Sequence, residues 1–348
     1  MPRFPPTSPV AGSRGALNRL STSIKIFNIM KFTSIPKNGS SWQNSLPVSF
    51  DTELAEPSDV VVQIRGLDGL NITRRLYGVT QATIDVAPYL RSSSCTPPQL
   101  TDSVSITPSK SAQRIQVAAN GVTSPYISLF HAPYRSTDSY LLSSGEQRQK
   151  HPAGVPILLT VYAQRQLTVF VAITTSRGTT SQSYVAKTNG MPMDIVIPAN
   201  VVSDSVKSIH LKVGDGLAEF ASITYEIVER GDNAKTIVWF NGSGGIESYT
   251  FPTSLRVSYD ARPAEGENVE RYVPLSSATV CYRLCSAYEP HAKMERLAEM
   301  LFSPRIFCLE GEVLTPISLR NRHVDFDSHG AIKQMCIEVE QEWKGGVR

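Results

Sequence analysis

Short runs of β-branched and aromatic residues, each closed by turn-forming residues, recur along almost the whole chain. Residues 60–65 (VVVQIR), for example, lead into a Gly-Leu-Asp-Gly turn at 66–69 and then into a second run at 72–77 (ITRRLY). Two such runs around a glycine-rich turn predict a β-hairpin. Only 19% of the 348 residues are charged, which is too few for a coiled coil or a long helical solenoid. The pattern therefore predicts a mainly β protein.

The spacing of these runs predicts two or more antiparallel β-sandwich-like domains and a small C-terminal α+β unit. Pro88, Pro97, Pro98 and Pro108 stand between runs, where we expect them to exclude a helix. From the turn signals we expect a disordered basic tail at 1–29, a β-sandwich domain at 30–133, and a loop or linker at 134–152. After the linker we expect a second β domain at 153–232, a β-hairpin-rich region at 233–288, and a helix plus a small β unit at 289–348. Within the second domain, expected strands include 167–174, 184–186 and 221–228.

One stretch has helical periodicity. In residues 290–302, Met294, Leu297, Leu301 and Phe302 follow the three-and-four spacing of a single apolar face. Ser303-Pro304 then ends the predicted helix. We interpret this stripe as core packing.

The net charge of +3 originates in the N-terminal segment. Residues 1–30 carry Arg3, Arg14, Arg19 and Lys25 with no acid, which leaves −1 for the rest of the chain. Because a nucleic-acid surface needs a basic stripe, we expect no nucleic-acid partner. No run of 18 apolar residues occurs, so we expect no membrane span. The N-terminal segment also lacks the apolar core of a secretion signal, and we interpret it as a loose tail, with a transit peptide as the alternative.

The cysteines are five in number, at positions 95, 281, 285, 308 and 336. An odd count without a secretion signal favours reduced thiols over disulfides. Cys281 and Cys285 are close enough in sequence to begin a tetrahedral zinc site. The further ligands available to such a site are His323, His329 and Cys336. No second close cysteine pair follows, and Tyr282 and Leu284 suit a strand, so we expect buried thiols on one strand face and no metal.

Two further motifs invite a chemical interpretation. The glycines among residues 242–245 suggest a phosphate-binding loop, but no Lys-Ser/Thr follows them and the next run is aromatic, so a hairpin turn is favoured. His323, Asp325, Asp327 and His329 form the densest ionisable cluster, with side chains able to bind a metal or exchange protons. We interpret this cluster as a solvated loop or strand edge because no other acid is paired with it. No catalytic or cofactor-binding residue is assigned, and we expect no enzyme activity.

Aromatic residues supply an alternative function. Trp42, Trp239 and Trp343 have the ring faces that stack on sugars when exposed, although the alternating run at 236–240 favours burial of Trp239. Trp42 with the loop residues Tyr134 and Tyr140 would suit a carbohydrate-binding or adhesive β-sandwich protein at a cell surface.

Three groups of segments carry a family resemblance. They are residues 30–36, 50–53, 75–79 and 84–90; residues 237–241 and 244–251; and residues 301–307 through Pro316-Ile317. They resemble the leading sandwich, the aromatic hairpin and the terminal module of tail-associated structural proteins from phages and prophages of gut bacteria. The similarity runs from about residue 30 to the end, and Ser243 departs from it, since a bulkier or charged residue is expected there.

The resemblance implies a non-enzymatic structural role in a phage-type tail or baseplate, with no cofactor. Its implied partners are other tail or baseplate proteins and further copies of the chain. Its implied location is the virion tail, after synthesis in the bacterial cytoplasm. Exposed strand edges give a physical route to such assembly, because their unpaired backbone groups can bond to another chain.

Overall fold

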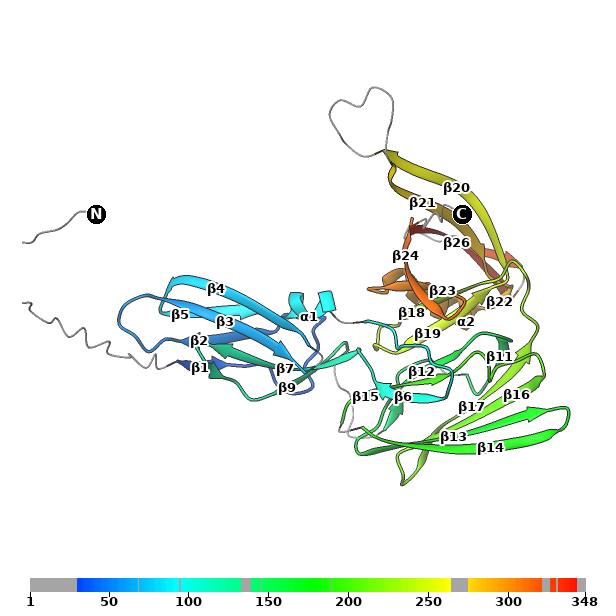
Figure 1. Ribbon diagram of the computed structural model, residues 1–348, viewed down its shortest axis with the longest axis horizontal. Coiled ribbons are helices and arrows are strands. Elements are labelled where there is room, and N and C mark those ends of the chain that lie inside the picture. Colours follow the sequence, from blue (N-terminus) through cyan, green and yellow to red (C-terminus); the bar gives the residue numbers. More distant parts are fainter. Residues whose placement is uncertain are drawn as a thin grey trace, which may run out of the picture.

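The computed structural model describes residues 30–67, 69–93, 95–132, 139–144, 146–188, 190–263, 275–320, 326–329 and 331–342. The expected disordered tail at 1–29 lies outside them. Strands dominate, and the helices are short, which confirms the predicted mainly β fold with a small helical segment near the C-terminus. Figure 1 shows a first sandwich that extends as an arm, and two further modules stacked on each other at its far end.

The first module is a sandwich of two antiparallel sheets. One sheet has the order β1 (Lys31–Ser34), β2 (Pro47–Asp51), β5 (Gln81–Asp85), and the other β4 (Asn71–Val79), β3 (Ser58–Gly66), β7 (Ala112–Ala119), β8 (Val122–Thr123), with β9 (Ile127–Phe130) also paired to β7. Alternate residues of β3 are buried, as expected for a strand with one face on a core. Trp42, Phe50 and Leu90 are among the largest side chains in that core.

The second module is also a sandwich. Its sheets have the orders β10 (Tyr140–Leu141), β12 (Ile157–Tyr162), β15 (Pro192–Ile197), β6 (Ser105–Pro108), and β11 (Arg148–Pro152), β17 (Glu219–Val228), β16 (Val206–Gly214), β13 (Gln166–Thr175), β14 (Gly178–Lys187). The pairs are antiparallel except β11 with β17, which is parallel. The two sheets enclose a single apolar core.

The third module is one long curved sheet with a helix packed on it. Its order is β19 (Ile246–Phe251), β18 (Lys235–Phe240), β23 (Ile306–Glu310), β24 (Val313–Leu319), β26 (Ile332–Glu342), β21 (Leu275–Cys285), β20 (Thr253–Pro263), and β22 (Glu289–Pro290) and β25 (Phe326–His329) pair with β26. Helix α2 (His291–Ala298) and the 3-10 turn η1 (Glu299–Phe302) bury Met294, Leu297 and Met300 against this sheet.

The predicted helix is confirmed, with one error in its apolar face. Met294 and Leu297 are buried as expected and Leu301 is half-buried, but Phe302 is 83% exposed and Met300 is buried in its place. The cause is the change to 3-10 geometry at Glu299, which shifts the angular spacing of the last turn.

A second helix, α1 (Ala87–Ser93), was wrongly excluded by the proline argument. Pro88 lies in its first turn, where a helix needs no N–H donor and the fixed φ of proline is favourable. The Asp85 carboxylate accepts a hydrogen bond from the Ala87 N–H at 3.0 Å and so satisfies one of the open donors.

The expected domain limits differ from the observed modules in three places. Strand β6, inside the expected first domain, pairs with β15 of the second module. The expected linker at 134–152 contains strands β10 and β11. No boundary falls at residue 288, because β18 to β21 and β22 to β26 belong to one sheet. The spacing of turn signals locates individual strands. The limits of the modules differ from the expected ones because they depend on which strands pair, and those strands are far apart in sequence.

The second and third modules share a packed interface. Every residue of β12 and β15 is buried, and so is all of β18 after Lys235. One face of β12 and β15 lies in the second module's core, while Leu158 and Val196 from the other face pack on Val238, Phe240 and Phe307 of the third. Strands buried on both faces fix the two modules as a layered unit.

The β18–β19 hairpin tip joins all three modules. Gly244 has φ +82°, as the expected hairpin turn requires, and a Cβ there would lie 2.8 Å from the His131 Cβ of the first module. A Cβ on Gly245 would overlap the main chain of Leu142 in the second module. Asn241 holds the turn by accepting the Gly245 N–H at 2.9 Å and donating to the Leu142 carbonyl at 2.9 Å. The two glycines therefore let the hairpin tip of the third module approach the first and second modules closely.

Buried polar groups complete this junction. The Thr160 hydroxyl donates to the Asp194 carboxyl at 2.7 Å and accepts the Ile246 N–H at 3.1 Å. The Ser143 hydroxyl donates to the Ile246 carbonyl at 2.6 Å. Because these bonds link the second module to the hairpin of the third, the interface has a single register.

Gly245→Ala will destabilise the fold, since the new methyl group has no space beside the Leu142 main chain. We expect a loss of about 1 to 3 kcal/mol in the free energy of unfolding, the usual cost of overpacking. Denaturant unfolding followed by circular dichroism measures it. Gly242→Ala is the matched control, because Gly242 is exposed and a Cβ there meets nothing within 4 Å. Equal stability of the two variants would contradict the tight junction.

The buried carboxyl of Asp194 should make the free energy of unfolding depend on pH. Burial raises its pKa from 3.8 to about 7. Between these values the folded chain keeps a proton that the unfolded chain has lost, so the free energy of unfolding falls as the pH rises. From pH 5 to pH 7, wild type should lose about 2 kcal/mol relative to Asp194→Asn, which keeps an oxygen for Thr160 but cannot ionise. Denaturant unfolding at several pH values tests this, and parallel curves for the two proteins would contradict it.

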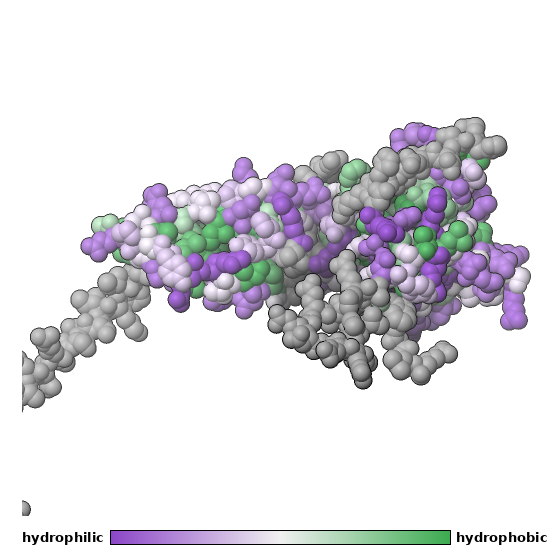
Figure 2. Space-filling view, turned by 90° about the horizontal axis from the view of Figure 1, so that it is seen from above, coloured by the Kyte–Doolittle hydropathy of each residue, from purple (hydrophilic) through white to green (hydrophobic). Residues whose placement is uncertain are grey.

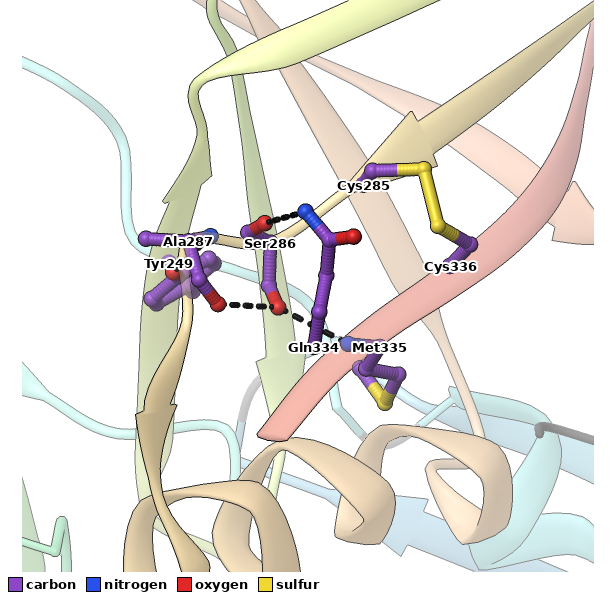
Figure 3. Close-up of a disulfide and its surroundings, with 7 residues drawn as sticks. All are labelled: Tyr249, Cys285, Ser286, Ala287, Gln334, Met335 and Cys336. Carbon is purple, nitrogen blue, oxygen red and sulfur yellow. Dashed lines mark hydrogen bonds between the residues drawn. A yellow bond between two sulfur atoms is a disulfide. The ribbon is translucent and has the colours of Figure 1, made fainter. Parts of the chain in front are cut away.

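The structure corrects the expectation of five reduced thiols. Cys285 and Cys336 face each other on β21 and β26 and form a disulfide, while Cys281 and Cys308 are buried thiols. Figure 3 shows the bond beside Ser286, whose carbonyl accepts a hydrogen bond from the Gln334 side chain at 2.8 Å. The number of cysteines does not reveal this pair, because the two cysteines meet only through the register of two strands that are far apart in sequence.

Thiol titration tests the disulfide. Five cysteines with one bridge leave three thiols, so denatured but unreduced protein should react with three equivalents of a thiol reagent, and reduced protein with five. A reaction with five equivalents of the reagent in the absence of reductant would contradict the disulfide and support five reduced thiols.

Candidate functional site

The structure does not assemble the zinc site considered from the sequence. Cys285 and Cys336 are joined in the disulfide. Cys281 Sγ accepts a hydrogen bond from the Arg320 guanidinium at 3.6 Å. His323 and Asp325 lie outside the described residues, whereas Asp327 and His329 fall in β25. Among the described residues, no group of three or more His, Cys, Asp or Glu side chains is placed to share an ion.

The aromatic residues proposed to stack on sugar are mostly unavailable. Trp42 is 1% exposed and Trp239 2% exposed, which confirms the predicted burial of Trp239. Tyr140 is half-buried against Tyr162, with ring centroids 5.4 Å apart. Tyr134 and Trp343 lie outside the described part of the chain.

A cysteine and a histidine that sequence reasoning did not connect lie side by side in the first module. Cys95 Sγ is 3.6 Å from His131 Nδ1, and the Gln43 amide is 2.8 Å from His131 Nε2. Such a pair resembles the nucleophile and base of covalent catalysis. Cys95, however, is 1% exposed and packs among Leu158 and Phe240. Burial also lowers the pKa of His131, so this pair is part of the packed junction.

One exposed sheet edge of the second module is the strand β14. It pairs with β13 over ten residues and forms the end of its five-stranded sheet. Residues 178–183 are all exposed. Residues 178–186 contain no charged residue and no proline, two of the usual protections of a sheet edge, and the charges Arg177 and Lys187 stand only at the ends of this run. The strand is therefore an open template for pairing.

A shallow groove of about 170 Å³ lies beside this edge. Its apolar lining comes from Val171 and Ile173 of β13, Tyr184 of β14, and Val104 and Val201 of neighbouring loops. Several of these side chains are half-buried at the margin of the second module's core. An added strand would find backbone partners on β14 and an apolar depression for its alternate side chains.

A second edge lies on the third module, where β20 ends the long sheet and projects from the body with β21 (Figure 1). Leu255, Val257 and Tyr259 of β20 are 59%, 50% and 54% exposed. Figure 2 shows apolar residues of this module and of the arm among hydrophilic ones. A register shift between Arg256 and Ser258 bends β20, and Arg256 stacks 5.1 Å from the Tyr259 ring centroid, so this edge is better protected than β14.

Sequence reasoning placed only residues 184–186 of β14 in a strand. The polar run at 178–183 lacks the alternation of a half-buried strand because both of its faces are exposed. The missing charge in this stretch was visible in the sequence and is the signal that could have identified the edge.

Comparisons with known proteins identify no relative of this chain. No protein-family model matches it, and no curated protein matches it. Among solved structures, the chicken interferon gamma receptor alpha chain has 13% identity and a TM-score of 0.16, covering 55% of this chain and 93% of that one. A Dpr2 Ig1-Ig2 complex with DIP-Theta Ig1-Ig3 has 10% identity and a TM-score of 0.16, covering 57% and 99%.

An Escherichia coli alpha-2-macroglobulin structure has 8% identity and a TM-score of 0.20, covering 91% of this chain and 30% of that one. At these TM-scores the similarities carry no argument, and the β-sandwich description rests on the sheets themselves. As a separate finding, no helix within the described ranges has the length and apolar character to cross a bilayer.

Proposed function

We propose that this protein is a non-enzymatic assembly component of a phage-type tail or baseplate, and that it joins neighbouring subunits by strand addition. The observation that carries the proposal is the unprotected edge of β14, with nine consecutive residues free of charge and proline and an apolar groove beside it. Natural sheets usually block such edges, so an edge left open on a folded module favours a strand partner.

The proposed partner is another copy of the chain or another tail protein. Two of the sheet edges of each chain, β14 and β20, are unlike each other and lie on two modules that pack as one unit. Pairing β14 of one copy with β20 of the next is a heterologous contact, which forms a ring where the rotation closes and a tube where it does not. The family resemblance from residue 30 onward supports the tail assignment over other assemblies.

The disulfide is compatible with a virion location. Disulfides persist in oxidising surroundings and are rare in a reducing cytosol. In a virion released from the cell, the Cys285–Cys336 bond would hold β21 to β26 beside the projecting β20 edge.

Ser181→Lys combined with Ser183→Lys tests the β14 contact. Both serines are exposed, and lysines there would oppose an approaching strand by charge and bulk. We expect light scattering after size exclusion to show oligomers for wild type and self-association weaker by about tenfold or more for the variant, equivalent to about 1.4 kcal/mol.

Leu217→Lys is the matched control, because Leu217 is 90% exposed in the β16–β17 turn and not on a sheet edge. It should assemble as wild type does. A wild-type protein that stays monomeric at every concentration would reject pairing between copies, and a double variant that assembles unchanged would reject the β14 contact. A monomer that binds sugars on a glycan array would favour the carbohydrate-binding alternative instead.

A further inference from the structure

A cleft separates the second and third modules at one side of their shared interface. Its volume is about 260 Å³, slightly below the range of about 300 to 1,000 Å³ that holds drug-sized ligands. β11, β12 and β17 line one wall, and β19 with the start of α2 lines the other. Clefts between domains with an apolar wall and a few convergent polar groups are the usual form of a small-molecule site.

The polar groups of the cleft include a carboxyl without a counter-charge. Glu247 accepts hydrogen bonds from the Asn241 side chain at 2.7 Å and from the Ser144 main chain. No lysine, arginine or histidine among the described residues forms an ion pair with it. Burial raises the pKa of Glu247 to about 7. A buried carboxyl that has neutral donors only is stabilised by any cation brought beside it.

None of the other charged residues that line the cleft forms an ion pair with Glu247. Lys150 and Glu229 are exposed, and Arg230 donates to the Ala234 carbonyl at 3.3 Å.

Glu289 lies 2.9 Å from the Lys293 ammonium and accepts the Tyr249 hydroxyl at 3.1 Å. His151 donates its Nε2–H to the Val155 carbonyl at 2.9 Å, and burial lowers its pKa to about 4, so it stays neutral above pH 5.

The groups that face Glu247 itself also lack positive charge. They are the Tyr225 hydroxyl from β17 and the Glu299 carboxylate from η1, whose charge raises the pKa of Glu247 further. The apolar wall includes Leu158, Ile246 and Pro252.

We propose that this cleft binds a small amphipathic amine, whose ammonium group lies against Glu247 and Tyr225 while its hydrocarbon part covers the apolar wall. The ammonium supplies the missing positive charge, and the Tyr225 oxygen adds a second acceptor. A carboxylate ligand is disfavoured by Glu247 and Glu299. This site is independent of the β14 edge and goes beyond the proposed assembly role.

The test compares three probes of equal chain length, n-hexylamine, n-hexanol and hexanoate, by isothermal titration calorimetry on the full chain at pH 8. Hexylamine should bind at least about tenfold more tightly than hexanol, and hexanoate should not bind, because only the amine neutralises the carboxyl. Equal binding of the amine and the alcohol would overturn the proposal, and a hexanoate preference would as well.

The pH dependence provides a second readout that needs no variant. Because the amine binds the ionised carboxylate, its affinity should rise about tenfold from pH 6 to pH 8, following the ionisation of Glu247, while that of hexanol should stay constant. A pH-independent amine affinity would contradict the site.

Glu247→Gln removes the charge and keeps an oxygen for Asn241, so it should abolish the amine preference. Asp194→Asn is the matched control, because Asp194 is also a buried carboxyl with a raised pKa but does not line the cleft. An unchanged amine preference in Glu247→Gln, or an equal loss in Asp194→Asn, would assign the binding elsewhere.

Discussion

The structure depends on the close approach of the β18–β19 hairpin tip to the first and second modules. Glycines at 244 and 245 let its main chain contact His131, Ser111 and Leu142, where any side chain would collide. Around this contact the buried bonds of Asn241 and Thr160 leave one register for the interface. Because backbone and buried polar groups set this geometry, the modules are joined by shape and hydrogen bonding in addition to apolar packing.

This junction fixes the relative positions of the two exposed strand edges and forms the cleft. Strands β12, β15 and β18, buried on both faces, fix the second module to the third, so β14 and β20 are held on one unit at different edges. An assembly through strand addition needs such fixed edges, since a flexible linker between them would not define a ring or a tube. The cleft beside Glu247 results from the same stacking of two modules.

Local sequence patterns identified most of the strands, the C-terminal helix and the glycine turn, because alternation, three-and-four spacing and turn residues act over a few positions. They failed where distant segments meet. The register of β21 and β26 pairs Cys285 with Cys336, and the pairing of β6 with β15 crosses an expected domain limit. Pro88 does not exclude a helix, because it lies in the first turn of α1, where Asp85 accepts the Ala87 N–H. The edge of β14 was missed because the polar run at 178–183 lacks strand alternation, and the cleft because strands far apart in sequence form it.

Hydrogen exchange on the assembled and the dissociated protein tests the central claim most directly, which is that copies pair through the edge of β14. In the assembled state, the outward N–H groups of residues 178–186 should gain protection as they bond to an incoming strand, while those of the interior strand β16 stay unchanged. Protection that appears elsewhere on the molecule, with β14 exchanging as fast as in the monomer, would contradict the account.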